Sequence, residues 1–98
     1  MRTLYEYSYE ELKDDINIVV ETYKLGSKPT QTFHGKRMYN EMFSPEEMVI
    51  VDEILPRIRS AYVHHSVELT FTSKEVDVFY KLIQYCARVQ WIGNITTK

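Results

Sequence analysis

The stretch VELTFTSKEVDVFYKLIQYCARVQWI, residues 67–92, decides the fold because it predicts a strand that leads directly into a helix. Its first five residues alternate between apolar and polar, which is the period of two expected of a strand with one buried face. Thr72 and Glu75 then have the spacing of a capping box, in which each side chain accepts a hydrogen bond from the backbone amide of the other. We therefore predict a strand over residues 67–71 and a helix over residues 73–92.

This last helix has more apolar surface than one small core requires. On a helical wheel Asp77, Lys81, Gln84 and Arg88 share one narrow arc, and apolar side chains cover most of the remainder. Val78, Tyr85 and Ile92 lie well away from the side that carries Phe79 and Cys86. Two explanations are open: the other predicted helices pack on both sides of this helix, or part of it contacts another chain.

Two further helices are predicted by the combination of a capping box and a one-sided apolar stripe. The first covers about residues 9–24 and ends before Gly26, which we expect to adopt the left-handed conformation. The second covers about residues 45–63, and its apolar stripe keeps its phase across Pro56. We therefore predict one helix kinked at this proline, with the proline turned toward water.

The remaining segments predict shorter elements. Residues 2–7 have the composition of a strand that could pair with the strand described above. Because a two-stranded sheet is marginal alone, we expect a third strand from residues 29–39 or from a second copy. Residues 27–43 allow a hairpin or a loop followed by a short helix from residue 37, and we favour the loop and helix. Residues 94–98 are expected to form a frayed tail.

Together these elements predict a single α+β domain over residues 1–98, with three main helices and a small sheet. This length is sufficient to bury a core without metals or disulfides. The single cysteine, Cys86, cannot form an intramolecular disulfide. The chain shows neither a secretory signal nor an apolar run long enough to span a membrane, so we expect a cytoplasmic protein.

The sequence offers no catalytic or metal-binding pattern. The soft metal ligands are His34, His64, His65 and Cys86, and they lack the spacing of zinc sites. Cys86 lies on the apolar side of its helix, where a thiol has a raised pKa and is unreactive. Glycine-rich phosphate-binding motifs are also absent from the sequence. We therefore expect a protein without enzymatic activity, cofactor or metal.

One segment is basic, although the formal charge of the whole chain is −2. Residues 24–37 carry no acidic side chain, and their basic side chains are those of Lys24, Lys28, Lys36 and Arg37. With Phe33 available to stack on a base, this loop would suit a nucleotide or nucleic acid. A solvated surface loop is favoured, because the chain as a whole is acidic and general nucleic-acid binders are usually basic.

The strongest functional indication is the surplus apolar surface of the last helix. Tyr85, Trp91 and Ile92 near its end, together with Val78, are expected to anchor a protein partner or a second copy. Small acidic proteins without catalytic residues are often bacterial or phage inhibitors or regulators, which is an analogy by class. The sequence therefore predicts a non-enzymatic interaction protein that self-associates and inhibits or regulates a larger macromolecule. Nucleotide or nucleic-acid binding by residues 24–37 is the alternative.

Overall fold

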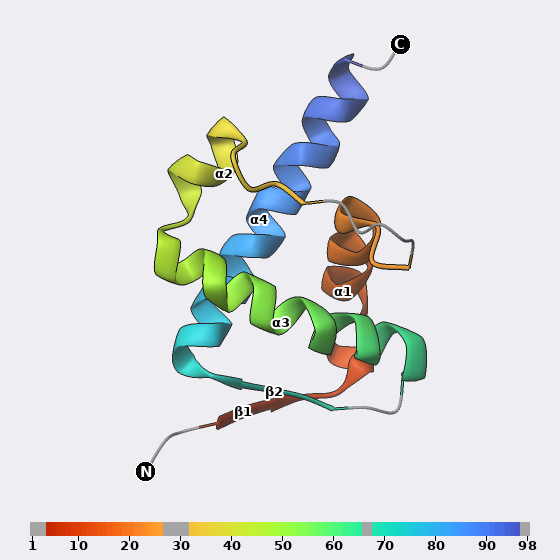
Figure 1. The fold of residues 1–98 in the computed structure, drawn as a ribbon. Coiled ribbons are helices and arrows are strands. Elements are labelled where there is room, and N and C mark those ends of the chain that lie inside the picture. The colour runs from red at the N-terminus through yellow and green to blue at the C-terminus, as the bar shows by residue number, and fades with distance from the viewer. Residues whose placement is uncertain (1–3, 27–31, 66–67, 97–98) are drawn as a thin grey trace.

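The structure, a computed structural model, describes residues 4–26, 32–65 and 68–96, with side chains up to residue 92 (Figure 1). In chain order its elements are β1 (Leu4–Tyr7), α1 (Tyr9–Tyr23), α2 (Arg37–Met42), α3 (Pro45–His64), β2 (Leu69–Thr72) and α4 (Ser73–Thr96). The predicted α+β class, with three main helices and a small sheet, is confirmed. Strand β2 extends one residue past its predicted end, to Thr72, and α4 stays helical to Thr96 where a frayed tail was predicted from residue 94.

The sheet is a single antiparallel pair in which Leu4 lies opposite Thr72 and Tyr7 lies opposite Leu69. The predicted pairing of the two strands is therefore confirmed. Within the described chain, residues 32–36 form a loop that leads into α2, so the loop and short helix are confirmed and the hairpin is wrong there. Residues 27–31 and Val67 lie outside the described part of the chain.

The short helix α2 forms because its spacing brings two aromatic side chains onto one face. Tyr39 and Phe43 are four residues apart, and their ring centroids are 4.8 Å apart in the core. A strand over the same residues would place successive side chains on opposite faces. The buried aromatic pair therefore favours helix over the third strand that was expected from this region.

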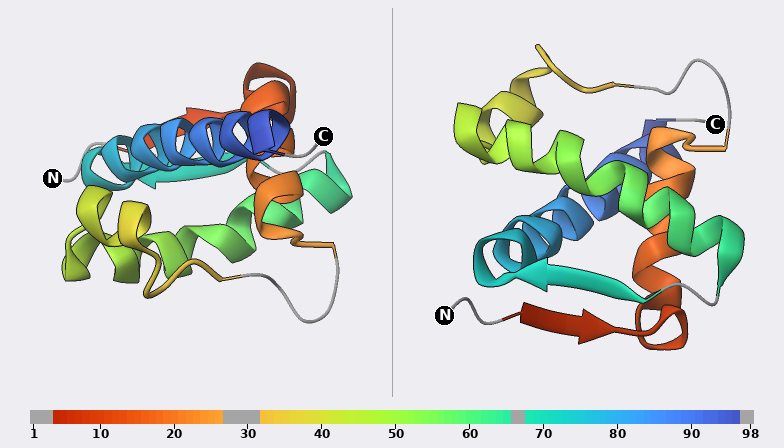
Figure 2. Two further views of the ribbon diagram at one scale, coloured as in Figure 1. Left: turned by 90° about the horizontal axis from the view of Figure 1, so that it is seen from above. Right: turned by 60° about the horizontal axis from the view of Figure 1, so that its bottom comes forward.

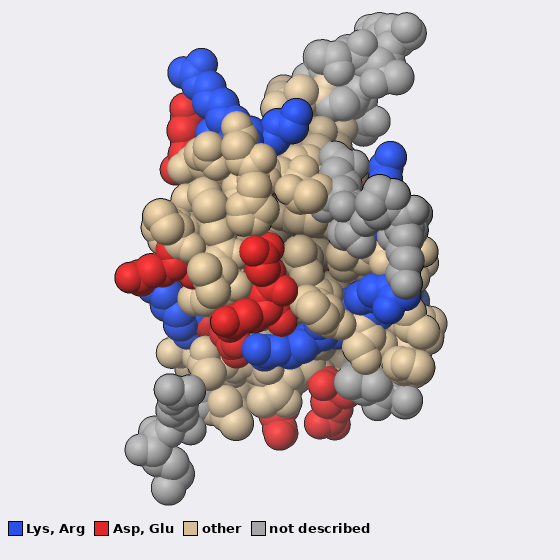
Figure 3. Space-filling model, in the orientation of Figure 1, with Lys and Arg blue, Asp and Glu red and all other residues tan. Residues whose placement is uncertain are grey.

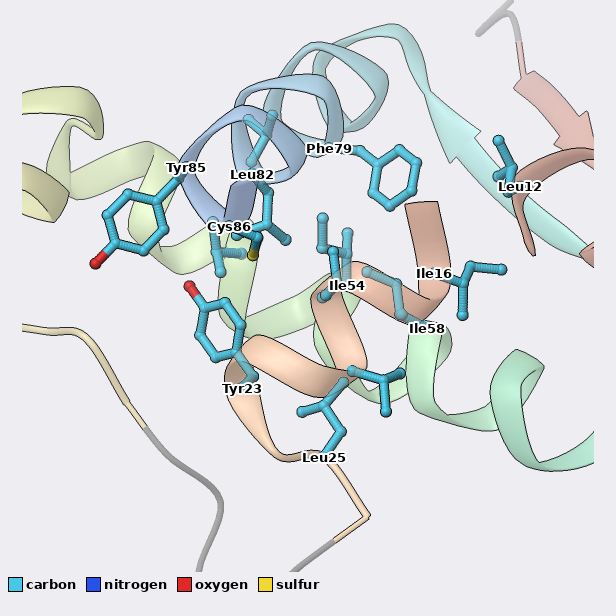
Figure 4. Close-up of a cluster of buried hydrophobic side chains, with 14 of the residues drawn as sticks. Leu12, Ile16, Tyr23, Leu25, Ile54, Ile58, Phe79, Leu82, Tyr85 and Cys86 are labelled. Atoms are coloured by element: carbon cyan, nitrogen blue, oxygen red, sulfur yellow. The ribbon is translucent and has the colours of Figure 1, made fainter. Parts of the chain in front are cut away.

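Helix α4 is the central element of the fold and contacts each of the other three helices. Its buried side chains are those of Val78, Phe79, Leu82, Tyr85 and Cys86. They pack against apolar side chains of α1 and α3, including Ile16, Ile54 and Ile58 (Figure 4). Figure 2 shows β2 between β1 and the helices, so that β1 is the outermost element. The first explanation for the wide apolar surface, packing on several sides, therefore accounts for most of it.

The three predicted capping boxes are all formed. In the first, the Glu11 amide donates to Ser8 Oγ over 3.3 Å, and the Ser8 amide donates to Glu11 Oε1 over 3.1 Å. The equivalent pairs at the start of α3 and α4 are Ser44 with Glu47 and Thr72 with Glu75. Each box satisfies amides that a helix start otherwise leaves unpaired, which is why these boundaries were predictable.

Two local details complete the helices. Lys24 has a φ of 56° and ends α1 in the left-handed conformation, which we had expected of Gly26. The left-handed turn at Lys24 lets the Leu25 amide donate to the Val20 carbonyl over 3.1 Å and buries the Leu25 side chain. Helix α3 continues through Pro56, and this proline is exposed, as predicted.

Two ion pairs join α3 to α4, and each uses the glutamate of a capping box. Lys81 Nζ lies 2.8 Å from Glu47 Oε2, and Arg57 Nη2 lies 2.7 Å from Glu75 Oε2. The hydrogen bond from Lys81 lowers the pKa of Glu47, and the hydrogen bond from Arg57 lowers the pKa of Glu75, both from the usual 4.5. Both carboxylates are therefore more stable as anions in the folded chain.

These lowered pKa values predict a loss of stability in acid. A carboxyl group with a lowered folded-state pKa stabilises the fold above its unfolded-state pKa, and this stabilisation disappears as the pH falls through the folded-state value. We expect the urea midpoint to fall as the pH drops below about 4.5. The double variant Glu47→Gln, Glu75→Gln should be less stable at neutral pH and lose less stability in acid. Burial raises the pKa of Asp15, so this residue affects the pH dependence of stability in the opposite sense, and it does so in both proteins. Equal acid sensitivity of the two proteins would contradict this assignment.

Candidate functional site

The C-terminal end of α4 projects beyond the ends of α1 and α2 (Figure 1). A helix rises about 1.5 Å per residue, so the 24 residues of α4 span about 36 Å and the 15 residues of α1 about 22 Å. The side chain of Trp91 lies on this projection and is 65% exposed. Ile92, beside it, is 45% exposed. These two predicted partner-binding residues are therefore at the surface.

The turn of α4 that contains Gln90 is hydrogen-bonded to α1. Gln90 Nε2 donates to Thr22 Oγ1 over 2.9 Å, and the Thr22 hydroxyl donates to the Ile18 carbonyl over 2.7 Å. Both acceptors belong to α1. The bond from Gln90 ties α4 to α1 one residue before Trp91, so the tryptophan extends from an anchored helix.

The other two predicted partner-binding residues, Val78 and Tyr85, are buried, so their predicted exposure is corrected. Val78 is fully buried and Tyr85 is 2% exposed. The Tyr85 ring packs edge-on against Phe33, with centroids 5.3 Å apart, and against Tyr39, with centroids 5.4 Å apart. The loop at residues 32–36 and α2 bring these rings onto α4, and this was the segment whose structure the sequence left open.

An aromatic cluster forms where α1, α2 and the loop meet α4, and Figure 4 shows Tyr23, Tyr85 and Cys86 lying close together within it. Burial raises the pKa of Tyr85 and that of Tyr39 to about 12. Burial also raises the pKa of Tyr23. The tyrosine hydroxyls are thus held in their neutral form, which is the behaviour of core residues.

Cys86 belongs to this core, and burial raises its pKa to about 12. We expect its thiol to react with a disulfide reagent at least about a hundredfold more slowly in the folded protein than in denaturant, because the thiolate is the reacting form. The measurement is the rate of colour release from a chromogenic disulfide at mildly alkaline pH. Similar rates in the two conditions would show an accessible thiolate.

The described basic residues of the alternative site come from different elements of the fold. Lys24 caps α1, whereas Lys36 and Arg37 lie at the start of α2, and all three are exposed. Arg37 Nε is 3.0 Å from Glu41 Oε1. Lys28 lies outside the described residues. On the face drawn in Figure 3, basic side chains alternate with acidic ones among the coloured residues.

Phe33 cannot stack on a base as predicted, because it is 5% exposed. Its ring lies edge-on to Tyr23, with centroids 4.9 Å apart, and contacts Tyr85 as well. Its position within the basic segment, residues 24–37, suggested a surface residue, but the aromatic cluster holds it in the core. The alternative site therefore retains charge and loses its aromatic platform.

The described contacts of His34 and His65 involve different partners. His34 Nε2 lies 3.3 Å from Asp52 Oδ2, and the His65 ring stacks on Tyr9 with centroids 4.1 Å apart. His64 is exposed at the end of α3. In the parts of the chain that the structure describes, no group of three or more metal-ligating side chains could hold a metal ion.

Two cavities lie beside α3. Each is lined in part by polar side chains that already form hydrogen bonds within the protein. One, of about 350 Å³, is lined by Arg57, Ser60, Glu68, Leu69 and Thr70. The other, of about 230 Å³, is lined by Leu25, Asp52, Leu55, Pro56 and Arg59. Arg57 is bound to Glu75, and Arg59 donates to the Leu25 carbonyl over 2.9 Å.

A second exposed apolar surface was missed in the sequence. It lies around β1, where Leu4 is 56% exposed, Tyr5 is 41% exposed and Tyr80 of α4 is 52% exposed. The weak alternation of residues 2–7 was the available signal, because an edge strand buries little of either face. Leu4 and Tyr5 are therefore candidate contact residues in addition to Trp91.

Among the described helices, none combines the length and the apolar character needed to cross a membrane. Comparison of the chain with protein-family models, curated proteins and solved structures finds no match. The function proposed below therefore rests on the geometry of this chain alone.

Proposed function

We propose that this protein is a non-enzymatic interaction protein that associates with itself and binds a larger protein in the cytoplasm. By occupying a surface of that protein it would inhibit or regulate it, as small accessory proteins of bacteria and phages do. The observation that carries this proposal is the 65% exposure of Trp91 on the projecting end of α4. Tryptophan is the side chain most enriched among residues that dominate binding energy, and the core does not use this one.

The geometry of α4 suits docking because its exposed end is pre-organised. Five α4 side chains between residues 78 and 86 are buried, and Gln90 fixes the turn before Trp91. A rigid helix loses little conformational entropy on binding, so more of the contact energy contributes to affinity. The end of such a helix, with its aromatic side chain, fits an apolar groove on a partner.

Trp91 is the only tryptophan of the chain and therefore reports directly on this surface. A photo-crosslinking residue at position 87, an exposed position one helical turn before Trp91, would capture the partner in the native host and leave the tryptophan in place. The exposed position of Asp77 on the same helix is the control. The captured protein is then purified and titrated. We expect Trp91 emission to shift to shorter wavelength and to become protected from acrylamide. Trp91→Ala is expected to weaken binding at least about thirtyfold.

Two results would contradict the proposal. Binding that leaves Trp91 emission and quenching unchanged, with unaltered affinity after Trp91→Ala, would remove this surface from the interaction. Binding of a nucleotide or nucleic acid that weakens steeply with salt, and with charge reversal of Lys24, Lys36 or Arg37, would favour the alternative function.

A further inference from the structure

The two edges of the sheet differ in the availability of their backbone groups. On the edge of β2 that faces α3, Arg57 Nη1 donates to the Thr70 carbonyl over 3.1 Å. On the same edge the Thr72 amide donates to Glu75 Oε1 over 2.9 Å. Arg57 and Glu75 are themselves an ion pair, so side chains close this edge and exclude a further strand.

These bonds also fix which way the backbone of β1 faces. In an antiparallel pair, opposite residues alternate between pairs that exchange backbone hydrogen bonds and pairs whose groups point away from each other. Thr70 and Thr72 point their groups away from β1, and they lie opposite Glu6 and Leu4. The N–H and C=O groups of Leu4 and Glu6 therefore point to the outer edge of β1. Within the described residues these groups have no hydrogen-bond partner, and this edge faces outward in Figure 2.

We propose that β1 pairs with β1 of a second copy of the chain, so that two sheets join into one antiparallel sheet of four strands. This inference rests on the self-association included in the proposed function and assigns it to a particular surface. That surface lies at the opposite end of the molecule from the projecting end of α4 (Figure 1). A dimer formed in this way leaves Trp91 exposed and available to a partner.

The register of this pairing follows from the outward-facing groups. A two-fold axis through Tyr5 places Leu4 of each copy opposite Glu6 of the other, and this satisfies all the free N–H and C=O groups of both residues. Tyr5 then lies opposite Tyr5. A register with Glu6 opposite Glu6 would oppose two carboxylates and would require the Ser8 amide, which already donates to Glu11. A shift by one residue would oppose outward-facing groups with inward-facing ones.

The side chains favour a second copy as the occupant of this edge. Tyr5 and Leu4 are exposed, and the pairing brings the two Tyr5 rings together as a cross-strand aromatic pair. Tyr80 is also exposed, and it lies near the hydroxyl of Tyr7, whose pKa is raised chiefly by burial. Natural edge strands usually carry a proline, a charged side chain or a bulge that prevents pairing. Residues 4–7 carry no proline and one charged side chain, Glu6, which the proposed register places opposite Leu4 and not opposite a second carboxylate. Each copy of the chain therefore presents the same unpaired backbone groups and the same exposed apolar side chains, so two copies can pair through this edge.

The test is the dimer dissociation constant of the full chain, measured by sedimentation, with matched variants at the edge. Glu6→Pro removes an outward N–H without removing a bond to β2, and it is expected to weaken the dimer at least about tenfold. Glu6→Gln keeps that N–H and is expected to retain the dimer. Circular dichroism confirms that each variant is folded.

A second pair of variants keeps the test decisive if Glu6→Pro does not fold. Tyr5→Lys places two ammonium groups opposite each other across the axis, and Tyr5→Glu places two carboxylates there. Each variant alone is expected to be mainly monomeric. A mixture of the two is expected to form a mixed dimer, because opposite charges then meet at position 5. This rescue requires the proposed register.

The outcomes separate this inference from the proposed function. Loss of the dimer in Glu6→Pro and Tyr5→Lys, with rescue on mixing and unchanged Trp91 emission, supports pairing through β1. A dimer that survives both changes overturns the inference, and a concentration-dependent blue shift of Trp91 would then place self-association on α4 and leave the proposed function standing. A wild-type protein that stays monomeric overturns both the inference and the self-association in the proposed function.

Discussion

Replacing Tyr85 with alanine is expected to lower the free energy of unfolding by about 3–4 kcal/mol. The Tyr85 side chain is 2% exposed and contacts Phe33, Tyr39 and Phe43, so its removal leaves a cavity among rings that cannot all move to fill it. The loss is a large share of the total stability of a domain of this size. Urea unfolding followed by circular dichroism measures it.

Trp91→Ala is the matched control on the same helix. Because the Trp91 side chain is 65% exposed, we expect a change of less than about 0.5 kcal/mol in the free energy of unfolding. The two variants remove aromatic side chains six positions apart, so a helix-wide effect would change both. Equal destabilisation by the two changes would contradict the assignment of Tyr85 to the core and Trp91 to the surface.

Replacing Glu75 with alanine is expected to cost about 2 kcal/mol of stability. The Glu75 carboxylate closes the capping box of α4 by accepting the Thr72 amide, and it accepts two hydrogen bonds from Arg57. Its side chain is 13% exposed, whereas that of Arg57 is 41% exposed. Water therefore solvates Arg57 in part after the change, and this limits the loss. Thermal and urea unfolding measure the effect.

Glu11→Ala provides the matched control, because Glu11 closes an equivalent capping box at the start of α1. Among the described residues no cation pairs with Glu11, so we expect a loss of only about 0.5 kcal/mol. The double variant Glu75→Ala, Arg57→Ala should be less destabilised than the sum of its single changes. Additive effects of Glu75 and Arg57, or equal losses at Glu75 and Glu11, would show that the Arg57 pair contributes nothing.

The long helices could be predicted because their signals are local. A serine or threonine followed three residues later by glutamate marks each helix start, and the apolar stripe of α3 keeps its phase through Pro56. The strand pair was also predictable, because β2 alternates strictly. The end of α1 was less certain, because Lys24 takes a left-handed conformation that a glycine adopts with less strain.

The candidate site was only half predictable, because burial depends on contacts distant in sequence. Tyr85 and Val78 belong to the apolar surface of one helix, and the helical period alone does not say which other elements cover them. Tyr85 is buried by Phe33 and Tyr39, which come from a segment with two possible structures in the sequence. Trp91 remains exposed because α4 extends beyond the helices that pack against it.

The free edge of β1 depends on a similar long-range arrangement. Nothing in residues 2–7 indicates that Arg57, more than 50 positions away, closes the opposite edge of the sheet. Only the register of the two strands shows that the groups of Leu4 and Glu6 face outward. The surfaces that carry the functional proposals are thus set by tertiary structure, whereas the elements that display them are set by local sequence.

The most direct test of the central claim, that this protein acts by association, is the sedimentation equilibrium of the unmodified chain over a wide range of concentrations. The chain has a mass of 11.7 kDa, and we predict an average mass that rises toward twice this value as concentration increases, without the excess absorbance at 260 nm that bound nucleotide would give. A mass that stays at 11.7 kDa at every concentration up to the solubility limit would contradict the claim.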